Sequence, residues 1–301
     1  MSKKYKENLD FKQSAIGEFV LVDGDDYHAF TAGQGEETLV LMAGESVPCP
    51  VLDFKPIWLL LKDKFRIVII EKAGYGFSDV TDKARDIATL VRDNRVVLDK
   101  LNISPPYILV AHSYAGLEAI YWTQKHKKEV RAIVSLDMTV PEFIDITKIP
   151  PIVKLVMCYS RIFKNANISE KRATKLTEKF PSYNHPLLNK EDKKTFLRVI
   201  MHRFMTINMV NEIKMMTKNA GVVRTLEYPK DVPILFFSSD LKDAAKNAKK
   251  STQELLKLQK DFIANFKFNK HIILECDHFV HAHKSELIAR EIYDFVSVIG
   301  A

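Results

Sequence analysis

Residues 107–116, YILVAHSYAG, determine how the rest of this chain is interpreted. The four residues at 107–110 predict a fully buried β-strand, and good helix formers follow at 117–124. Between them lies Ser113, with an alanine two positions away on each side. A sharp turn from strand to helix needs small residues around its tip, because larger side chains would collide with the turn. The pattern is a variant of G-x-S-x-G, and it predicts that the Ser113 hydroxyl stands above the end of a sheet, beside a helix N-terminus.

The composition is that of a globular protein, with 47% hydrophobic residues in a chain of 301. The 45 basic and 38 acidic residues give a net charge of +7 and are spread along the chain. Aromatic residues do not alternate with the basic clusters, so we expect no nucleic-acid partner. Three widely separated cysteines, Cys49, Cys158 and Cys276, favour a reducing compartment over a disulfide framework.

No apolar stretch approaches the roughly 20 residues that are needed to span a bilayer, so we expect no membrane span. The N-terminus is charged and no apolar segment follows it, which argues against a signal peptide or a membrane anchor. We therefore expect a cytoplasmic protein, unless a targeting or anchor segment is removed from a longer precursor.

Hydrophobic patterns along most of the chain alternate between those of strands and those of helices. This alternation predicts βαβ units and a mainly parallel sheet. The expected strands are an opening hairpin at 16–31 and buried runs at 38–42, 65–70, 107–110, 130–136, 232–237 and 272–274. The expected helices of this sheet domain lie at 53–61, 87–101, 117–124, 253–266 and 285–299.

Between residues 139 and 228 the alternation stops, and the segment is helical in pattern and rich in methionine. Methionine is a flexible, apolar lining material, so the segment predicts a helical cap that is inserted into the sheet domain. The helical stretches lie at 152–163, 169–180, 190–203 and 206–218. The expected organisation is an N-terminal extension at 1–15, a first part of the core at 16–138, the cap at 139–228 and a second part of the core at 229–301.

A second chemistry-bearing stretch, ECDHFVHAH at 275–283, follows the last expected strand. Its position predicts that His278 lies at the carboxyl edge of the sheet near Ser113, where it serves as the general base. His281 follows one helical turn later and is expected to lie beside the site without taking part in the reaction. The stretch is also dense in metal-ligand atoms, but no second cluster with ligand spacing occurs elsewhere. We therefore expect no metal and no cofactor.

Three motifs in this order resemble those of the α/β-hydrolase superfamily, specifically its capped serine hydrolases. They are the loop EKAGYGFSD at 71–79, the serine turn at 111–116 and the histidine segment DHFVH at 277–281. The resemblance extends over about residues 16–299. It implies an α/β-hydrolase fold, in which a mainly parallel, eight-stranded-type sheet is flanked by helices and carries the inserted cap. It also implies that Ser113 is a nucleophile.

The resemblance further implies an oxyanion hole that is formed by two backbone N–H groups, those of Glu45 and Tyr114. The first lies in Ala43-Gly44-Glu45, where the family usually has His-Gly. Because the donor is a backbone group, loss of the histidine need not affect it. A carboxylate beside a developing oxyanion is unfavourable, so Glu45 is expected to point away or to meet a cationic group of the substrate.

The carboxylate that orients the base has two candidate positions. We favour Asp137, which directly follows the strand at 130–136. The alternative is Asp240, in the loop at 238–243 after the strand at 232–237, where the family more commonly has its acid. Either carboxylate would lie at the carboxyl edge of the sheet, beside the same histidine.

These features predict a serine hydrolase that cleaves a small carboxylic ester through an acyl-enzyme intermediate. The methionine-rich cap favours an ester with an apolar acyl or alcohol part. The alternative enzyme is an aminopeptidase of the proline iminopeptidase type, with Glu45 or Glu142 binding the substrate amine. A third hypothesis is a catalytically silent binding protein of the same fold. A serine nucleophile argues against haloalkane dehalogenase and epoxide hydrolase activity, because relatives with those activities use an aspartate as the nucleophile. The sequence does not determine the oligomeric state.

Overall fold

The structure is a computed structural model that describes residues 11–146, 168–240 and 246–299. The helix that was expected at 152–163 lies outside these residues, as do Cys158 and most of the expected N-terminal extension.

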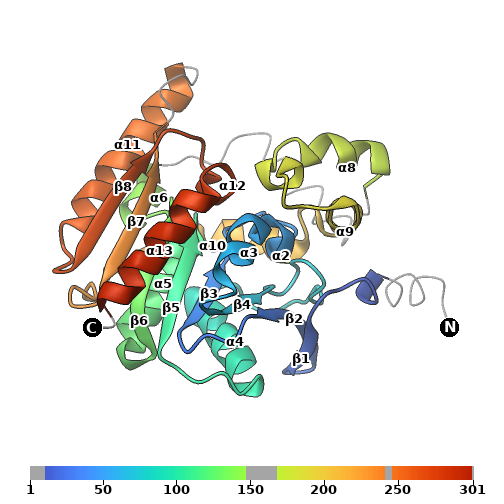
Figure 1. Ribbon diagram of the computed structural model, residues 1–301, viewed down its shortest axis with the longest axis horizontal. Helices are drawn as coiled ribbons and strands as arrows, with labels where there is room; N and C mark the ends of the chain where they lie inside the picture. The colour runs from blue at the N-terminus through green and yellow to red at the C-terminus, as the bar shows by residue number, and fades with distance from the viewer. Residues whose placement is uncertain (1–10, 147–167, 241–245, 300–301) are drawn as a thin grey trace.

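Eight strands form one sheet at the centre of the protein (Figure 1). They are β1 (Glu18–Val22), β2 (Asp25–Ala32), β3 (Thr38–Met42), β4 (Arg66–Ile70), β5 (Tyr107–His112), β6 (Val130–Leu136), β7 (Ile234–Ser239) and β8 (Asn269–Leu274). Their order across the sheet is β1-β2-β4-β3-β5-β6-β7-β8. β2 pairs antiparallel with β1 and with β4, and every other neighbouring pair is parallel. The prediction of a mainly parallel, eight-stranded sheet is confirmed.

Helices cover both faces of this sheet (Figure 1). One face packs against α2 (Pro50–Asp53), α3 (Lys55–Leu61), α12 (Val280–His283) and α13 (Ser285–Ile299). The other face packs against α4 (Ile87–Lys100), α5 (Ala115–Lys125) and α11 (Lys246–Ile263). Because both faces are covered, the central strands need apolar residues at every position. Accordingly, β3, β5 and β7 bury each of their residues.

Between β6 and β7 the chain forms a group of helices. They are α6 (Pro141–Ile146), α8 (Glu170–Thr177), the 3-10 helix η2 (Pro181–Asn184), α9 (Lys190–Arg203) and α10 (Ile207–Arg224). Figure 1 shows α8 and α9 as a pair at one side of the sheet domain. Phe180 and Phe196 share their core with Leu52 and Phe77 of the sheet domain, whereas α10 packs against α5 and α6. The domain boundaries given above remain predictions.

The clearest differences from the expected helix bounds concern three stretches. The helix expected at 53–61 is divided into α2 and α3, because Pro56 lacks the N–H that a continuous helix needs and fits a first helical turn. α10 continues through Gly221 to Arg224, so this glycine does not end the helix. α11 begins at Lys246, earlier than the periodicity indicated.

The carboxyl ends of the parallel strands bring the predicted site residues to one edge of the sheet. Glu45 lies just after β3, Ser113 follows β5, and Asp137 follows β6. Asp240 follows β7, and His278 lies in the loop after β8. In open α/β sheets this edge is where ligands bind.

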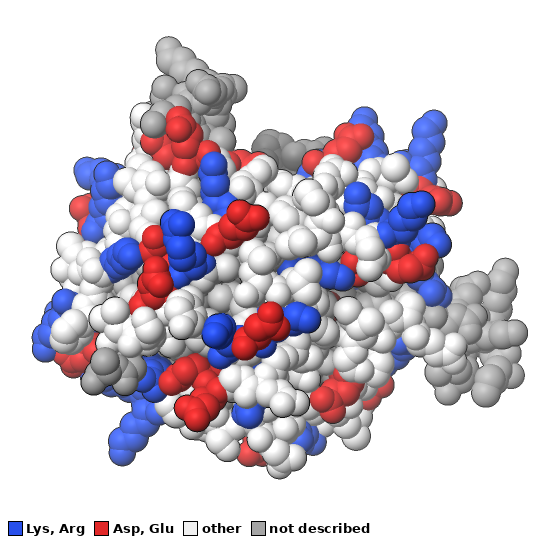
Figure 2. All heavy atoms as spheres, in the orientation of Figure 1, with Lys and Arg blue, Asp and Glu red and all other residues white. Residues whose placement is uncertain are grey.

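In the described residues, no helix is both long enough and apolar enough to cross a bilayer. Figure 2 shows basic and acidic side chains interspersed over one face of the molecule, in agreement with their spread along the sequence.

Candidate active site

Ser113 occupies a sharp turn between β5 and α5, and its φ of 55° lies in the left-handed region. Residues other than glycine rarely adopt this conformation, so the surrounding structure must hold the turn in place. A Cβ atom on Gly44 would lie 2.6 Å from the Cβ of Ser113, and one on Gly116 would lie 2.7 Å from the carbonyl oxygen of Thr139. Gly44 and Gly116 therefore allow close packing around the serine turn, and Gly116 belongs to the small residues that predicted a sharp turn here.

Ser113, His278 and Asp137 form a continuous chain of hydrogen bonds. Ser113 Oγ lies 2.8 Å from His278 Nε2, and His278 Nδ1 lies 2.7 Å from Asp137 Oδ2. An ionised carboxylate only accepts hydrogen bonds, so Nδ1–H donates to Asp137 and Nε2 accepts from the hydroxyl. This arrangement can remove the hydroxyl proton while the oxygen attacks an electrophile.

Asp137 is buried and is surrounded by hydrogen-bond donors. Ser239 donates from its backbone N–H to Oδ1 (3.1 Å) and from its hydroxyl to Oδ2 (2.6 Å). Gln259 of α11 also donates to Oδ1 (3.1 Å). Burial alone would raise the pKa of Asp137, but the hydrogen bond and charge of His278, with these donors, hold the pKa below its ordinary value. Asp137 therefore remains ionised. Ser239 and Gln259 were not among the predicted site residues.

Asp240, the alternative acid, lies at the end of β7. Its backbone N–H donates to the carbonyl oxygen of Leu274 (2.8 Å). The hydrogen bond of His278 Nδ1 goes to Asp137 instead. Of the two candidate carboxylates, the structure thus brings the favoured one into contact with the histidine.

The His278 side chain is 39% exposed, so substrate and water have access to the ring. Burial of part of the ring lowers the pKa of His278, but the hydrogen bond and charge of Asp137 outweigh this effect. Glu45 and Asp277 add smaller contributions, and the resulting pKa lies above the ordinary value. A base with a pKa that approaches the working pH suits general acid–base catalysis.

The two residues that carry the predicted oxyanion donors lie close to the serine. Tyr114 directly follows Ser113 at the start of α5, and the close approach of Gly44 places Glu45 next to the nucleophile. Glu45 is half-buried, and among the described residues its buried Oε2 atom has no hydrogen-bond partner. Burial raises the pKa of the Glu45 carboxyl. A protonated carboxyl would remove the negative charge that made Glu45 unfavourable beside an oxyanion.

The other histidines of the segment at 275–283 have separate partners. His281 Nε2 lies 2.9 Å from Asp53 Oδ2, and His283 Nε2 lies 2.9 Å from Asp277 Oδ1. In the part of the chain that the structure describes, no group of three or more His, Cys, Asp or Glu side chains is placed to hold a metal ion. The contact between His281 and Asp53 joins distant segments, and no sequence pattern indicates it.

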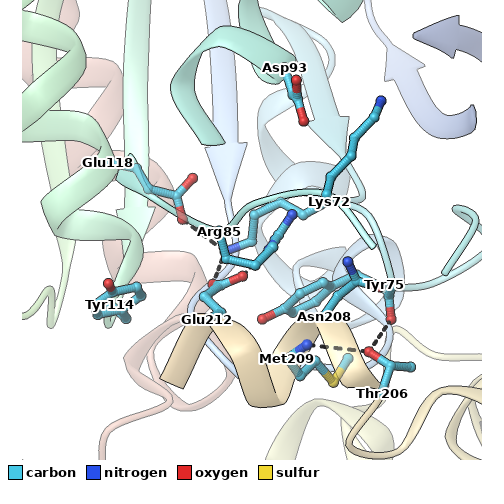
Figure 3. A network of polar contacts seen from close by, with 12 residues as sticks. Lys72, Tyr75, Arg85, Asp93, Tyr114, Glu118, Thr206, Asn208, Met209 and Glu212 are labelled. Atoms are coloured by element: carbon cyan, nitrogen blue, oxygen red, sulfur yellow. Dashed lines mark hydrogen bonds and ion pairs between the residues drawn. The ribbon is translucent and has the colours of Figure 1, made fainter. Parts of the chain in front are cut away.

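Four charged side chains form a buried network that extends from α5 to α10 (Figure 3). Lys72 Nζ donates to Glu118 (2.8 Å) and to Glu212 (2.5 Å), and Arg85 donates to Glu212 (2.6 Å). None of the four side chains is more than 7% exposed. Glu118 lies on α5, the helix that follows Ser113, and Glu212 lies on α10, so the network connects the serine turn with the helices between β6 and β7.

The cations of this network keep one of its carboxylates ionised. Burial acts to raise the pKa of Glu212, but Lys72 and Arg85 outweigh it and lower the pKa. For Glu118, burial outweighs Lys72 and the pKa is raised. The four residues of the network were not among the predicted site residues. Charged residue types are mostly exposed, and nothing in the spacing of these four indicates that they are buried.

Comparisons with known proteins agree with this architecture. A family model described as alpha/beta hydrolase fold matches residues 55–155. The uncharacterized protein YbdG of Bacillus subtilis is 28% identical over 249 residues, which cover 82% of this chain and 74% of YbdG.

Two solved structures are similar over almost the whole chain. An enol-lactonase from Burkholderia xenovorans is 15% identical with a TM-score of 0.63, over 93% of this chain and 100% of the lactonase. A loop variant of a haloalkane dehalogenase from Bradyrhizobium elkanii is 15% identical with a TM-score of 0.64, over 94% of this chain and 96% of the dehalogenase. These likenesses concern the fold, and they confirm the predicted fold class. The chain therefore has the alpha/beta hydrolase fold.

Proposed function

We propose that this protein is a serine hydrolase that cleaves a small carboxylic ester with an apolar moiety. The observation that carries the proposal is the chain of hydrogen bonds from Ser113 through His278 to Asp137, at 2.8 and 2.7 Å, with the serine in a strained turn. A hydroxyl with a base at this distance, and a base with an ionised carboxylate behind it, is the arrangement that acyl transfer needs.

In the proposed reaction, Ser113 Oγ attacks the ester carbonyl carbon while its proton passes to His278 Nε2. The backbone N–H groups of Glu45 and Tyr114 stabilise the oxyanion of the tetrahedral intermediate. The intermediate collapses, the C–O bond to the alcohol breaks, and the alcohol leaves with the proton from Nε2. Water then attacks the acyl-enzyme with His278 as base, which releases the acid and restores the serine.

Two features favour an ester with an apolar part. Met205 Sδ accepts a hydrogen bond from the Ser46 hydroxyl (3.5 Å), which places an adaptable apolar side chain beside the oxyanion loop. The nucleophile position holds a serine hydroxyl, which suits acyl transfer. The enol-lactonase of similar fold has a name that denotes cleavage of a cyclic ester, whereas the dehalogenase of similar fold is named for a different reaction.

A fluorophosphonate probe is expected to label the wild-type protein covalently at Ser113. The activated oxygen attacks phosphorus and displaces fluoride, and His278 takes up the hydroxyl proton. The Ser113→Ala variant lacks this oxygen and should stay unlabelled. Gel fluorescence measures the labelling, and mass spectrometry of the labelled peptide identifies the residue.

Ser297→Ala is a matched control for this experiment, because Ser297 is an exposed serine of α13. It should be labelled as strongly as the wild type. If the wild type is not labelled, the protein is not a serine hydrolase and the hypothesis of a silent binding protein gains support. Equal labelling of Ser113→Ala would show that another residue reacts.

Glu45 favours a second candidate, the hydrolysis of aminoacyl esters or amides. Its Oε2 atom is buried without a hydrogen-bond partner among the described residues. The nearby cation Lys72 is hydrogen-bonded to Glu118 and Glu212 instead. A substrate ammonium group would supply the missing partner and would draw Glu45 into its ionised form. The other candidate, Glu142, already accepts a hydrogen bond from the Tyr228 hydroxyl (2.5 Å).

Glu45→Gln separates the two substrate classes. With a p-nitrophenyl ester that has no amine, we expect kcat/KM to change less than about threefold, because glutamine copies the shape of a protonated glutamic acid. With an aminoacyl p-nitroanilide, loss of a buried carboxylate–ammonium pair should raise KM by about 10- to 100-fold.

Glu142→Gln serves as the control and should leave both substrates unaffected. Steady-state kinetics with both substrates decide the question. A wild-type preference for the anilide would favour the aminopeptidase hypothesis over the esterase hypothesis. Equal loss with both substrates in Glu45→Gln would mean that Glu45 acts on the oxyanion loop itself.

A further inference from the structure

Three histidine rings lie in a row at the carboxyl edge of the sheet. The centroids of His278 and His112 are 4.8 Å apart, and those of His112 and His281 are 4.7 Å apart. Only His278 has a part in the proposed reaction. The other two rings are buried, with exposed fractions of 1% for His112 and 0% for His281.

We propose that His112 is a positioning residue for His278 and that the buried pair of His281 and Asp53 holds His112 in place. The inference rests on the proposed function, in which His278 is the general base. It adds a second layer of histidines behind the hydrogen-bond chain, and through Ser182 it connects the base with the segment between β6 and β7.

The hydrogen bond of His112 fixes the backbone of the residue that carries the base. His112 Nε2 lies 3.2 Å from the carbonyl oxygen of His278. Because a carbonyl only accepts, Nε2 carries the proton and donates. His112 belongs to β5 and directly precedes Ser113, so this hydrogen bond ties the loop after β8 to the strand that presents the nucleophile.

The ring of His112 provides this donor without adding charge. Burial lowers the pKa of His112, and the nearby His281 and His278 lower it further, so the ring stays neutral. Its Nδ1 atom is then a bare acceptor, and it is buried without a partner among the described residues. An unpaired buried acceptor destabilises the folded protein, and an apolar side chain at this packing position would avoid that cost. The donor on the other side of the ring is what a histidine adds here.

His281 packs against His112 in a T-shaped arrangement, with an interplanar angle of 75°. Its Nε2–H donates to Asp53 Oδ2 (2.9 Å), and the hydroxyl of Ser182 donates to Asp53 Oδ1 (2.5 Å). All three side chains are fully buried. The ring of Phe54 packs against His281 at 5.1 Å and meets His112 edge-on at 6.5 Å. With the rings of His278, His281 and Phe54 packed around it, the His112 ring has little freedom to tilt.

This arrangement sets the position of His278 Nε2 relative to the Ser113 hydroxyl. The side chain of His278 contacts Asp137 and Ser113, whereas Cys276 and Phe279 donate short-range backbone hydrogen bonds, to the carbonyl oxygen of Leu274 and to the Asp277 side chain. Catalysis requires the base to stay within about 3 Å of the proton that it removes. A displacement of about 1 Å costs on the order of 100-fold in rate.

The test compares His112→Met with His112→Gln. Methionine fills the space without a strong donor, whereas glutamine restores an N–H donor at a similar reach. With a p-nitrophenyl ester, His112→Met should lower kcat by about 10- to 100-fold and change KM by less than about twofold. His112→Gln should recover at least half of this loss on a logarithmic scale, and fluorophosphonate labelling rates should follow kcat.

His271→Met is the matched control. His271 is a half-buried histidine of β8 that is hydrogen-bonded to Ser238 (2.8 Å) and lies outside the row of rings. The kcat of His271→Met should stay within about threefold of the wild-type kcat. Comparison with this variant also separates a loss of stability from a loss of positioning. Thermal unfolding of each variant reports the stability.

Ser182→Ala tests the far end of the row and keeps its packing, so it remains informative if His112→Met does not fold. We expect a loss of about three- to tenfold in kcat at unchanged KM, since the hydroxyl acts through three other side chains. Wild-type kcat in His112→Met, or equal losses in the Met and Gln variants, would overturn the inference while labelling at Ser113 leaves the proposed function intact. An unlabelled, inactive wild type would overturn both.

Discussion

Asp137→Asn is expected to lower kcat for a short p-nitrophenyl ester by about 10⁴-fold and to leave KM nearly unchanged. The carboxylate accepts the Nδ1–H of His278, and thereby leaves Nε2 free to accept the proton of Ser113. An asparagine amide that donates to Nδ1 would move the ring proton to Nε2, where it blocks this step. The wild-type acid also stabilises the imidazolium that forms during the reaction, and an uncharged amide does not.

Asp240→Asn is the matched control, because Asp240 is the other carboxylate at the same edge of the sheet. The same chemical change there should alter kcat by less than about threefold. Its backbone hydrogen bond to Leu274 is unaffected by the substitution. Steady-state kinetics and circular dichroism of both variants complete the measurement. Similar modest losses in the two variants would argue against either residue as the acid, and a large loss only in Asp240→Asn would reverse the assignment.

The sequence predicted those parts of the site that depend on a local pattern. A run of apolar residues at 107–110 predicts a buried strand, and small residues around Ser113 predict a tight turn, because the physical constraint lies within one short segment. The position of His278 follows from the end of β8 in the same way. A choice between Asp137 and Asp240 has no such local basis. Both follow parallel strands, and their distances to the histidine depend on the twist of the sheet and on the course of the loop after β8.

Contacts between side chains from distant segments were not predictable for the same reason. Gln259 reaches Asp137 from α11, and Asp53 reaches His281 from the end of α2. Neither the residue types nor their spacing distinguish these polar side chains from exposed ones. His112 was part of the quoted stretch from the start, but its role depends on a carbonyl that is brought next to it only by the folded sheet.

Lys72→Met is expected to lower the free energy of unfolding by about 3–5 kcal/mol, because it removes one partner from a buried ionic network. Lys72 is the common partner of Glu118 and Glu212, and the three side chains are at most 7% exposed. Without the lysine, Arg85 remains as the cation of the network, and it is hydrogen-bonded to Glu212. Glu118 must then be buried without its cation or be protonated. Urea denaturation, followed by circular dichroism, measures the change.

Lys194→Met is the matched control, since Lys194 Nζ lies 2.8 Å from Glu191 Oε1, the same distance that joins Lys72 to Glu118. In this pair the side chains are 73% and 78% exposed, and loss of an exposed pair should change stability by less than about 0.5 kcal/mol. Equal geometry with opposite burial isolates desolvation as the cause of the difference. Equal effects of the two variants would show that the network contributes no more than a surface pair.

The cost of Lys72→Met should also depend on pH. Burial already raises the pKa of Glu118, and Lys72 opposes this effect. In the variant the folded-state pKa rises further above the unfolded value, so Glu118 is protonated in the folded state at low pH with little loss of stability. Above the unfolded-state pKa of Glu118 and up to its folded-state pKa, the unfolded state binds fewer protons than the folded state. The free energy of unfolding therefore falls as the pH rises through this range. Destabilisation by Lys72→Met should therefore be greater at pH 8 than at pH 5. A cost that is independent of pH would mean that the lost packing of the lysine stem, rather than the unpaired carboxylate, accounts for the effect.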